Sequence, residues 1–274
     1  MTDSPAVPAH VLANVRQRWP EIADVWASYI QTEFRAICDQ YQATPRTVLG
    51  ARYGYVVAVD TPAGPLVFRS SPDPHGPDQA AVATALANLG ISPAVHQTLT
   101  SDHGTWTVLD RVLPGTNLAQ SDPATIRLDA LFTPLAAMRH QSAPREGMPS
   151  ILDWLHDRLN DGNLTDLRPG TTVAPVDERE TALKLLNNLV NDHTPRLCHG
   201  DASMGNIIAS GTDRWLLIDP RGMTGESAYD VAVLAIRTAR LHNPASLVPQ
   251  IAKLADVTAE RVRTWMTIAK AARV

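Results

Sequence analysis

The chain is organised around residues Leu197 to Leu234, which read LCHGDASMGNIIASGTDRWLLIDPRGMTGESAYDVAVL. A polar His-Gly-Asp turn that ends at Asp201 is followed by Asn206 and then by two short apolar runs. A Ser-Gly-Thr-Asp turn separates the two runs, and the second run ends on Asp219. This pattern predicts a strand, a tight turn and a second strand. We therefore expect the polar side chains at the two ends of the hairpin to meet in space.

The three polar residues have the chemistry that phosphoryl transfer requires. A carboxylate accepts a hydrogen bond from the attacking hydroxyl, while an amide oxygen and a second carboxylate hold Mg2+ against the nucleotide phosphates. An Asp, four intervening residues and an Asn, with a metal-binding Asp after the next strand, is the spacing of a kinase catalytic loop. The spacing therefore predicts Asp201 as the base and Asn206 and Asp219 as Mg2+ ligands.

This segment resembles the aminoglycoside phosphotransferase family, whose loop has His-Gly-Asp where protein kinases have His-Arg-Asp. The sequences IDPRG at 218–222 and AYD at 228–230 are similar to the streptomycin and hydroxyurea kinase branch. The resemblance implies an α+β, bilobal protein-kinase-like fold. Residues 1–110 would form a small amino-terminal lobe with an antiparallel sheet and leading helices, and residues 111–274 a larger, mainly helical lobe that carries catalysis and acceptor binding.

Two further residues of the stretch are expected to support the loop. Because Asp201 occupies the position of the base, His199 is expected to brace the loop by hydrogen bonds and not to move protons. Asp230 precedes an apolar helical run and could cap that helix. The resemblance implies instead that Asp230 holds the loop from behind, so both interpretations are structural.

The remaining elements are expected from periodicity and from Gly and Pro positions. Two helices are expected over 8–41, broken near Pro20, and the second has an apolar face that should pack on a sheet: Ile22, Val25, Trp26, Tyr29, Ile30, Ile37 and Tyr41. Strands are expected at 46–49, 53–59, 65–69, 94–99 and 105–109, with a helix over 79–89 between the third and fourth. Further helices are expected over 125–140, 151–159, 177–191, 231–241, 245–254 and 258–272.

The nucleotide-binding residues expected in the first lobe depart from the family pattern. Kinases place a Lys on the third strand and a Glu on the following helix, but the lysines of this chain are Lys184, Lys253 and Lys270. Alignment puts Arg69 at the Lys position and Gln79 at the Glu position. Arg keeps the charge and forks onto phosphate, and Gln can accept a hydrogen bond from it. An ordinary exposed strand-end charge is the alternative for Arg69.

Two more segments are candidates for nucleotide contact. Arg52 lies in a turn with two glycines and is a second candidate for phosphate contact, although an ordinary hairpin turn would also use glycines. The DRVLPG sequence from Asp110 resembles the inter-lobe segment of the family, which implies that the nucleotide base lies against backbone groups around Asp110 and Val112.

Composition limits the partners. The net charge is -4 and Lys and Arg are not clustered, so nucleic acid is not an expected partner. Two cysteines far apart in sequence fit a reducing, cytoplasmic location. No signal peptide is read at the amino terminus, and no apolar run reaches the roughly 20 residues of a membrane span. The oligomeric state stays open.

The acceptor site is the least determined part. Arg221 and Glu226 flank Asp219 in sequence and are candidates for acceptor or phosphate contact. Asp153 and Asp157 could line an acidic acceptor pocket, but a solvated helix face explains them at least as well.

The expected function is a Mg2+-dependent small-molecule O-phosphotransferase that moves the γ-phosphate of ATP or GTP to a hydroxyl. The closest branch implies an antibiotic acceptor of aminoglycoside, nucleoside or peptide type, and a role in self-resistance. A sugar or amino-sugar kinase of metabolism is one alternative. A nucleotide-binding pseudokinase is another, because Arg69 and Gln79 replace the usual Lys and Glu, although the retained Asp201, Asn206 and Asp219 argue against it.

Overall fold

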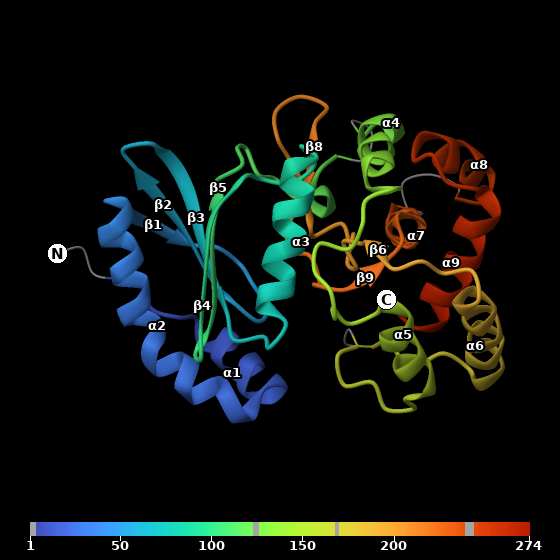
Figure 1. The fold of residues 1–274 in the computed structure, drawn as a ribbon, viewed down its shortest axis with the longest axis horizontal. Coiled ribbons are helices and arrows are strands. Elements are labelled where there is room, and N and C mark those ends of the chain that lie inside the picture. Colours follow the sequence, from blue (N-terminus) through green and yellow to red (C-terminus); the bar gives the residue numbers. More distant parts are fainter. Residues whose placement is uncertain (1–3, 123–125, 168–169, 239–243) are drawn as a thin grey trace. The chain divides into compact units, whose positions relative to one another are not determined.

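The computed structural model describes residues 4–122, 126–167, 170–238 and 244–274, and it divides into two compact units (Figure 1). The first comprises residues 1–80 and 93–112 and is called the sheet unit. The second comprises residues 81–92 and 113–274 and is called the helical unit.

The sheet unit contains an antiparallel sheet of five strands in the order β1-β2-β3-β5-β4. The strands are β1 (Thr44–Val48), β2 (Tyr55–Thr61), β3 (Gly64–Ser71), β4 (Val95–Ser101) and β5 (Gly104–Asp110). Thr61 pairs with Gly64 across the tight β2–β3 turn, and this register places Arg69 opposite Val56 on one side and Thr107 on the other. The five expected strands are therefore confirmed, with ends that differ by a few residues.

Two helices, α1 (Ala9–Arg18) and α2 (Pro20–Tyr41), precede the sheet, and they are separated at Trp19 as expected from Pro20. The buried residues of α2 recur at helical spacing and pack with aromatic side chains of the sheet: Ala23, Trp26, Ile30, Phe34 and Ile37. Val25 and Tyr29 are 45% and 46% exposed, so their expected burial was wrong. The contact stripe is rotated toward Phe34, whose ring meets Tyr55, Phe68 and Trp106.

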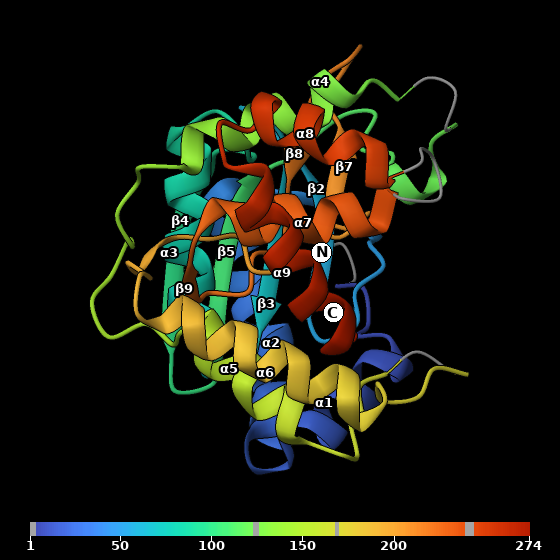
Figure 2. The ribbon, with the colours of Figure 1, turned by 90° about the vertical axis from the view of Figure 1, so that its right-hand side faces the viewer.

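The helical unit is built around α7 (Ser227–Thr238), in which every residue from Ser227 to Ala235 is buried. Helices α8 (Pro244–Leu254) and α9 (Ala259–Ala271) pack against α7, and α5 (Ile151–Asn160) and α6 (Val176–Val190) pack on each other, as Figure 2 shows. Helix α3 (Gly76–Asn88) is shared, since its residues from Ala81 onward belong to this unit. The short elements are η1 (Leu118–Gln120), β6 (Arg196–Leu197), β7 (Ile207–Ala209), β8 (Trp215–Leu217) and β9 (Thr224–Gly225).

The single long helix expected over 125–140 is wrong within the described residues, which begin again at Ile126. The chain forms a short α4 (Leu128–Phe132) followed by the 3-10 helix η3 (Thr133–Met138). Pro134 explains the break, because proline has no N–H to donate and its ring clashes with the carbonyl four residues earlier. The apolar face survives the change, since Leu131, Leu135 and Met138 are buried.

The ends and faces of the later helices differ from expectation in smaller ways. On α6 the buried residues are Ala182, Leu186 and Leu189, while Val190, one turn after Leu186, is 55% exposed. The helix expected over 231–241 is α7, which begins four residues earlier, and residues 239–241 of that expectation lie outside the described residues.

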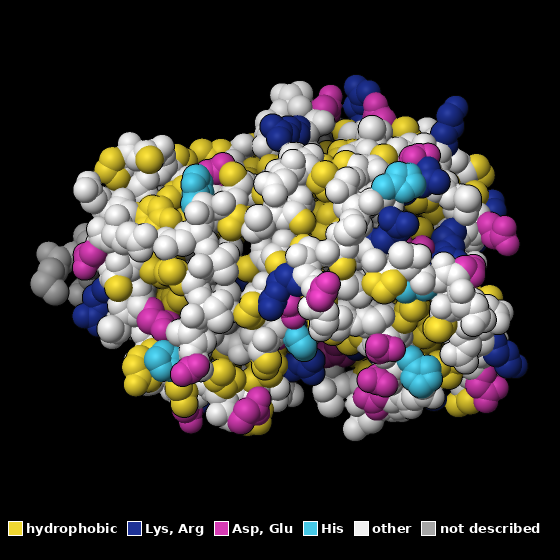
Figure 3. All heavy atoms as spheres, in the orientation of Figure 1, with side chains coloured by type: hydrophobic (Ala, Val, Ile, Leu, Met, Phe, Trp, Pro, Cys, Tyr) yellow, Lys and Arg dark blue, Asp and Glu magenta, His cyan; other side chains and the backbone are white. Residues whose placement is uncertain are grey.

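Charged side chains are mixed on the surface. On the face drawn in Figure 3, Lys and Arg side chains lie interspersed with Asp and Glu. None of the helices that the structure describes combines the length and the apolar character needed to cross a membrane.

His193, which lies between α6 and β6, should make stability depend on pH. Both of its ring nitrogens are buried without a hydrogen-bond partner among the described residues, and burial lowers its pKa from 6.5. Nearby Glu226 raises the pKa and Arg261 lowers it, but burial dominates. Because the unfolded chain then binds more protons than the folded one below about pH 6.5, the free energy of unfolding should fall as the pH drops through that range.

The His193→Leu variant removes this titration. Urea unfolding of both proteins at about pH 7.5 and pH 5.5 should show a larger loss of unfolding free energy in the wild type than in the variant. Equal losses in the two proteins would contradict the assignment.

Candidate active site

The hairpin expected from residues 207–219 is present. Strands β7 and β8 pair antiparallel with Ile207 opposite Leu217, and the Ile218 N–H donates to the Asn206 carbonyl at 2.9 Å. This ladder bond extends the register by one residue past the strands. It places Asn206 across from Ile218, so that Asp219 is the next residue along at the same end of the hairpin.

Asp201 and Asn206 are in direct contact. The Asn206 Nδ2 donates to the Asp201 carbonyl at 3.0 Å and to the Asp201 Oδ2 at 3.1 Å. Both bonds use the Nδ2 end of the amide, and Asn206 Oδ1 takes no part in either of them. The Asp201 side chain is 33% exposed and can reach a small molecule in solution.

Asp219 lies exposed directly after the β8 end of the hairpin, with its backbone in the left-handed region at φ 56°. Asp tolerates that conformation better than most residues because its short polar side chain bonds locally. Unusual backbone angles of this kind often occur at functional sites. In the strand register Asp219 is one residue past Ile218, the residue opposite Asn206.

The donors at this end of the hairpin suit Mg2+. An amide oxygen and a carboxylate are hard ligands, and Mg2+ commonly takes one or two carboxylates and completes its shell with water and substrate phosphates. Within the described ranges, no three His, Cys, Asp or Glu side chains gather as a metal site. An amide oxygen and one carboxylate would leave most of an octahedral Mg2+ shell to water and substrate phosphates.

His199 is fully buried and both of its ring nitrogens are engaged. Its Nε2 lies 2.9 Å from the Ile218 carbonyl, and its Nδ1 accepts from the Asp201 N–H at 3.3 Å. The tautomer with its proton on Nε2 satisfies both contacts. His199 therefore ties the residue before Asp219 to the residue that is the candidate base, as expected for a brace.

Asp230 holds the same loop from the side of α7. Its two carboxylate oxygens accept from the His199 N–H at 2.8 Å and from the Gly200 N–H at 2.9 Å. The side chain is fully buried, and burial raises its pKa despite these two bonds and the nearby His199. Asp230 lies inside α7 and not before its first residue, and both bonds run to the backbone of the loop.

Gly200 is required by its surroundings. Its φ is +81°, and a Cβ atom placed on it would come within 2.9 Å of the Arg221 Cβ. The Arg221 N–H also donates to the His199 carbonyl at 2.8 Å. The His-Gly-Asp turn and the segment after Asp219 are therefore packed backbone to backbone, which explains the glycine between His199 and Asp201.

Arg221 reaches the candidate base. Its Nη2 lies 3.8 Å from the Asp201 Oδ2, and its guanidinium carbon lies 4.2 Å from the centre of the Trp154 ring. Trp154, on α5, was not among the residues predicted for the site. The sequence of a half-apolar helix does not indicate that one of its aromatic rings will make a cation–π contact with a distant arginine.

The other acceptor candidates lie apart from these contacts. Glu226 accepts from the Arg261 Nε at 2.6 Å and from the Trp265 indole N–H, so its carboxylate is used in binding α9. Asp153 is exposed in the first turn of α5, and Asp157 is 88% exposed with the His156 ring 3.8 Å away. No contact places either aspartate beside Asp201.

In the sheet unit, the expected hydrogen bond between Arg69 and Gln79 is present. The Arg69 Nη2 donates to Gln79 Oε1 at 3.0 Å, and the Gln79 Nε2 donates to Asp73 Oδ2 at 2.8 Å. Asp73 was missed from the sequence, although an acidic residue between a strand-end Arg and a helical Gln is a usable signal. The side-chain amide of Gln79 therefore links the Asp73 carboxylate to the Arg69 guanidinium by two hydrogen bonds.

The remaining nucleotide candidates occupy turns and strand ends of the sheet unit. Arg52 is exposed, with its guanidinium 5.0 Å from the Tyr53 ring centre and its carbonyl bound by Asn14. Asp110 ends β5 and its Oδ1 lies 2.7 Å from the His96 Nε2. Val112 is half-buried at the end of the unit.

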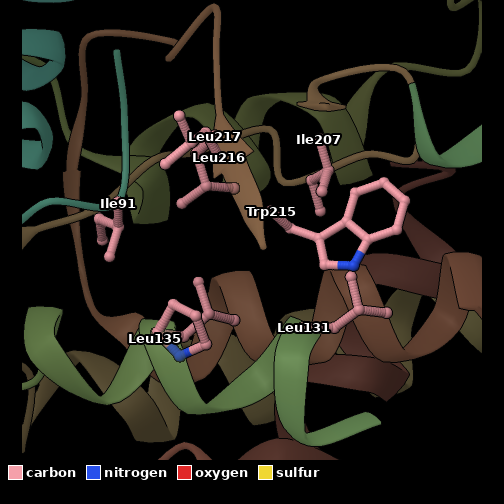
Figure 4. A pocket seen from close by; sticks show the side chains of 8 residues that line it. Ile91, Leu131, Leu135, Ile207, Trp215, Leu216 and Leu217 are labelled. Carbon is pink, nitrogen blue, oxygen red and sulfur yellow. The ribbon is translucent and has the colours of Figure 1, made fainter. Parts of the chain in front are cut away.

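A small pocket under the hairpin is apolar. Figure 4 shows the side chains that line it around the β8 strand, and the lining residues are Ile91, Leu131, Pro134, Leu135, Ile207, Trp215, Leu216 and Leu217. None of these side chains offers an acid, base or metal ligand. The pocket is therefore part of the packing that anchors the hairpin and not the place where chemistry is expected.

Comparison with known proteins gives the context of this geometry. The sequence model of the phosphotransferase enzyme family (APH) matches residues 46–265. No curated protein matches the chain. Among solved structures, an aminoglycoside-3'-phosphotransferase of type VIII is 20% identical with a TM-score of 0.57, covering 86% of this chain and 97% of that one.

Two other solved structures are similar. A choline/ethanolamine kinase family protein from Mesorhizobium loti is 14% identical with a TM-score of 0.62, covering 88% of this chain and 83% of that one. A thermostable mutant of aminoglycoside phosphotransferase APH(4)-Ia, in a ternary complex with ADP and hygromycin B, is 14% identical with a TM-score of 0.58. That match covers 85% of this chain and 87% of the other. At these identities the likeness shows the α+β, protein-kinase-like fold.

Proposed function

Because the chain belongs to the phosphotransferase enzyme family, we propose that it transfers the γ-phosphate of Mg-ATP or Mg-GTP to a hydroxyl of a small antibiotic-like molecule. The observation that carries the proposal is the contact of Asn206 with Asp201, at the end of the hairpin where Asp219 also lies. The spacing of these residues, the hairpin register and the hydrogen bond between Asn206 and Asp201 support the proposal.

In the proposed reaction Asp201 accepts a hydrogen bond from the acceptor hydroxyl and takes its proton as the oxygen attacks the γ-phosphorus. The bond between the γ-phosphorus and the β–γ bridging oxygen breaks, and ADP or GDP leaves with that oxygen. Asn206 Oδ1 and the Asp219 carboxylate would hold Mg2+, which neutralises charge on the phosphate oxygens when it is bound. His199 and Asp230 keep the loop in place through their contacts with the backbone. Positioning and charge neutralisation should supply most of the rate.

In the sheet unit, Arg69 would bind the nucleotide phosphates, and Gln79 would orient the Arg69 guanidinium. The hydrogen bond from Gln79 to Asp73 supports this role. A Glu at position 79 would carry a negative charge next to Arg69, and here the carboxylate of Asp73 supplies that charge on the other side of the Gln79 amide. Arg52 is a second phosphate contact, and the nucleotide base would use backbone groups near Asp110 and Val112. Arg forks onto phosphate oxygens with two donors, so the change from Lys preserves binding.

The residues support the acceptor class less directly. The resemblance of the IDPRG and AYD segments to the streptomycin and hydroxyurea kinase branch favours an antibiotic acceptor and a self-resistance role in the cytoplasm. The similar choline/ethanolamine kinase family protein favours the alternative of a kinase that acts on a sugar, amino sugar or amino alcohol of metabolism. Asp153 and Asp157 stay acceptor candidates, whereas the ion pair of Glu226 with Arg261 favours a structural role for Glu226.

A product screen tests the proposal. Purified protein is incubated with Mg-ATP or Mg-GTP and a panel of aminoglycoside, nucleoside and peptide antibiotics, sugars and amino alcohols, and products are detected by the mass of one added phosphoryl group. Product on an antibiotic, with raised tolerance when the gene is expressed in a sensitive host, supports the proposal. Product only on a sugar or amino alcohol supports the metabolic alternative, and tight nucleotide binding with no product on any acceptor supports a pseudokinase.

Replacing Arg69 by Ala should raise the nucleotide KM by about tenfold or more, because about 1.5 to 3 kcal/mol of charge-assisted bonding is lost. Initial rates at varied Mg-ATP measure the effect. Arg46→Ala is the matched control, since Arg46 is an exposed arginine of the same sheet that pairs with Asp60 at 2.6 Å and has no proposed nucleotide contact. An unchanged KM for Arg69→Ala would remove Arg69 from the nucleotide site.

A further inference from the structure

Arg221 is held more firmly than a surface arginine. Its backbone N–H is bonded to the His199 carbonyl at 2.8 Å, and its Cβ lies against Gly200. Its guanidinium carbon lies 4.2 Å from the Trp154 ring centre, well within the range of a cation–π contact. Its Nε is buried and has no hydrogen-bond partner among the residues that the structure describes. The side chain is therefore placed by packing and not by a network of hydrogen bonds.

The tryptophan is itself fixed. Trp154 is partly buried against the core of the helical unit, and α5 is capped by the Ser150 hydroxyl, which accepts from the Leu152 N–H at 3.1 Å. A second guanidinium, that of Arg158, lies 5.3 Å from the same ring centre and is anchored by Asp166 at 2.8 Å. Trp154 thus offers a rigid platform, and Arg221 is the arginine on it that reaches Asp201.

The two oxygens of Asp201 are in different situations. Oδ2 accepts from Asn206 Nδ2 at 3.1 Å and lies 3.8 Å from Arg221 Nη2. Oδ1 makes no hydrogen bond to any other described side chain or backbone group. A carboxylate held through one oxygen on two sides cannot rotate freely, so its other oxygen keeps a fixed direction.

We propose that Arg221, stacked on Trp154, is a positioning residue that holds the Asp201 carboxylate through Oδ2 and leaves Oδ1 to accept the acceptor hydroxyl. This inference rests on the proposed function. A planar guanidinium suits the task because it can stack on the indole while keeping a donor edge toward the carboxylate, which an ammonium does not do as well. Misplacing a catalytic group by about 1 Å can lower a rate by 10²-fold, so loss of the hold should lower kcat more than it changes substrate binding.

The test compares variants of Arg221, Trp154 and Arg158 by kcat and KM for Mg-ATP and for the first acceptor that the product screen identifies. Arg221→Gln should lower kcat on the order of 10- to 100-fold with little change in either KM, the effect of losing one interaction with a charged group. Arg221→Lys should recover part of that loss. Trp154→Leu should lower kcat by roughly 2- to 10-fold, because it removes only the platform.

Arg158→Gln is the matched control, because it removes a guanidinium from the same ring without touching Asp201. It should lower the melting temperature and leave kcat unchanged. Arg221→Ala should regain activity on addition of guanidinium chloride at concentrations well below those that unfold the wild type, a result that a purely structural role would not produce.

Three results for Arg221→Gln would overturn the inference while leaving the proposed function intact. The first is a wild-type kcat, the second is a lower melting temperature with an unchanged kcat, and the third is a raised KM for the acceptor with no other change. The last would make Arg221 an acceptor contact. A wild type that phosphorylates nothing in the screen would overturn the proposed function itself, and this inference with it.

Discussion

The Asp201→Asn variant is expected to lose most phosphoryl transfer, with kcat lower by about 10²- to 10⁴-fold, the usual contribution of a positioned general base. Asn has the shape of Asp and can keep the hydrogen bond from Asn206 Nδ2 through its own oxygen. Asn lacks the negative charge with which Asp201 is proposed to take the proton of the acceptor hydroxyl. Steady-state rates with Mg-ATP and an acceptor from the product screen measure the loss.

Asp192→Asn controls for charge. Asp192 is 71% exposed and its contact is an ion pair with Arg261 at 3.3 Å, a surface interaction worth at most about 1 kcal/mol. This variant should keep wild-type kcat. Full activity in Asp201→Asn would show that another group serves as the base.

Asp219→Asn has the second-largest expected effect. If Asp219 binds Mg2+ as proposed, replacing its carboxylate by a neutral amide weakens the binding of the ion, whose charge stabilisation in phosphoryl transfer is worth several kcal/mol. We expect kcat at fixed Mg2+ to fall by about 10²- to 10³-fold, and part of the activity to return at higher Mg2+. Rates measured across a Mg2+ titration at constant nucleotide separate the two effects.

The same hairpin supplies the control for that variant. Asp213, in the turn between β7 and β8, is also left-handed, at φ 52° against 56° for Asp219, and its carboxylate lies 3.8 Å from Arg127. Asn tolerates left-handed backbone as Asp does, so Asp213→Asn matches the charge and backbone change without the proposed metal contact. An Asp219→Asn variant with the Mg2+ dependence of Asp213→Asn would contradict the assignment of Asp219 as a ligand.

Sequence alone predicted the parts of the site that are local. The β7–β8 hairpin follows from two apolar runs around a four-residue turn, and its register fixes where Asn206 and Asp219 lie. The five strand segments of the sheet also follow from short-range pattern, because turn residues set their ends. The hydrogen bond between Arg69 and Gln79 was expected from alignment to the family pattern. The role of Asp230 was left between two interpretations until its bonds to His199 and Gly200 were seen.

Features that depend on packing between distant segments were not predictable. To predict the break between α4 and η3, the effect of Pro134 on the helix would have had to outweigh the apolar periodicity around it. The buried face of α2 depends on the contact of Phe34 with aromatic rings of the sheet such as Trp106. With Phe34 buried in this way, Tyr29 is exposed. The stack of Arg221 on Trp154 joins residues that lie far apart in the chain, and no periodicity records such a contact.

The most direct test of the proposed chemistry is a crystal structure of the protein with Mg2+ and a non-hydrolysable ATP analogue. The proposal predicts Mg2+ bound between the nucleotide phosphates and the side-chain oxygens of Asn206 and Asp219, with Asp201 Oδ1 open toward the γ-phosphate. A nucleotide bound with its metal away from Asn206 and Asp219, or with Asp201 turned away from the γ-phosphate, would contradict it.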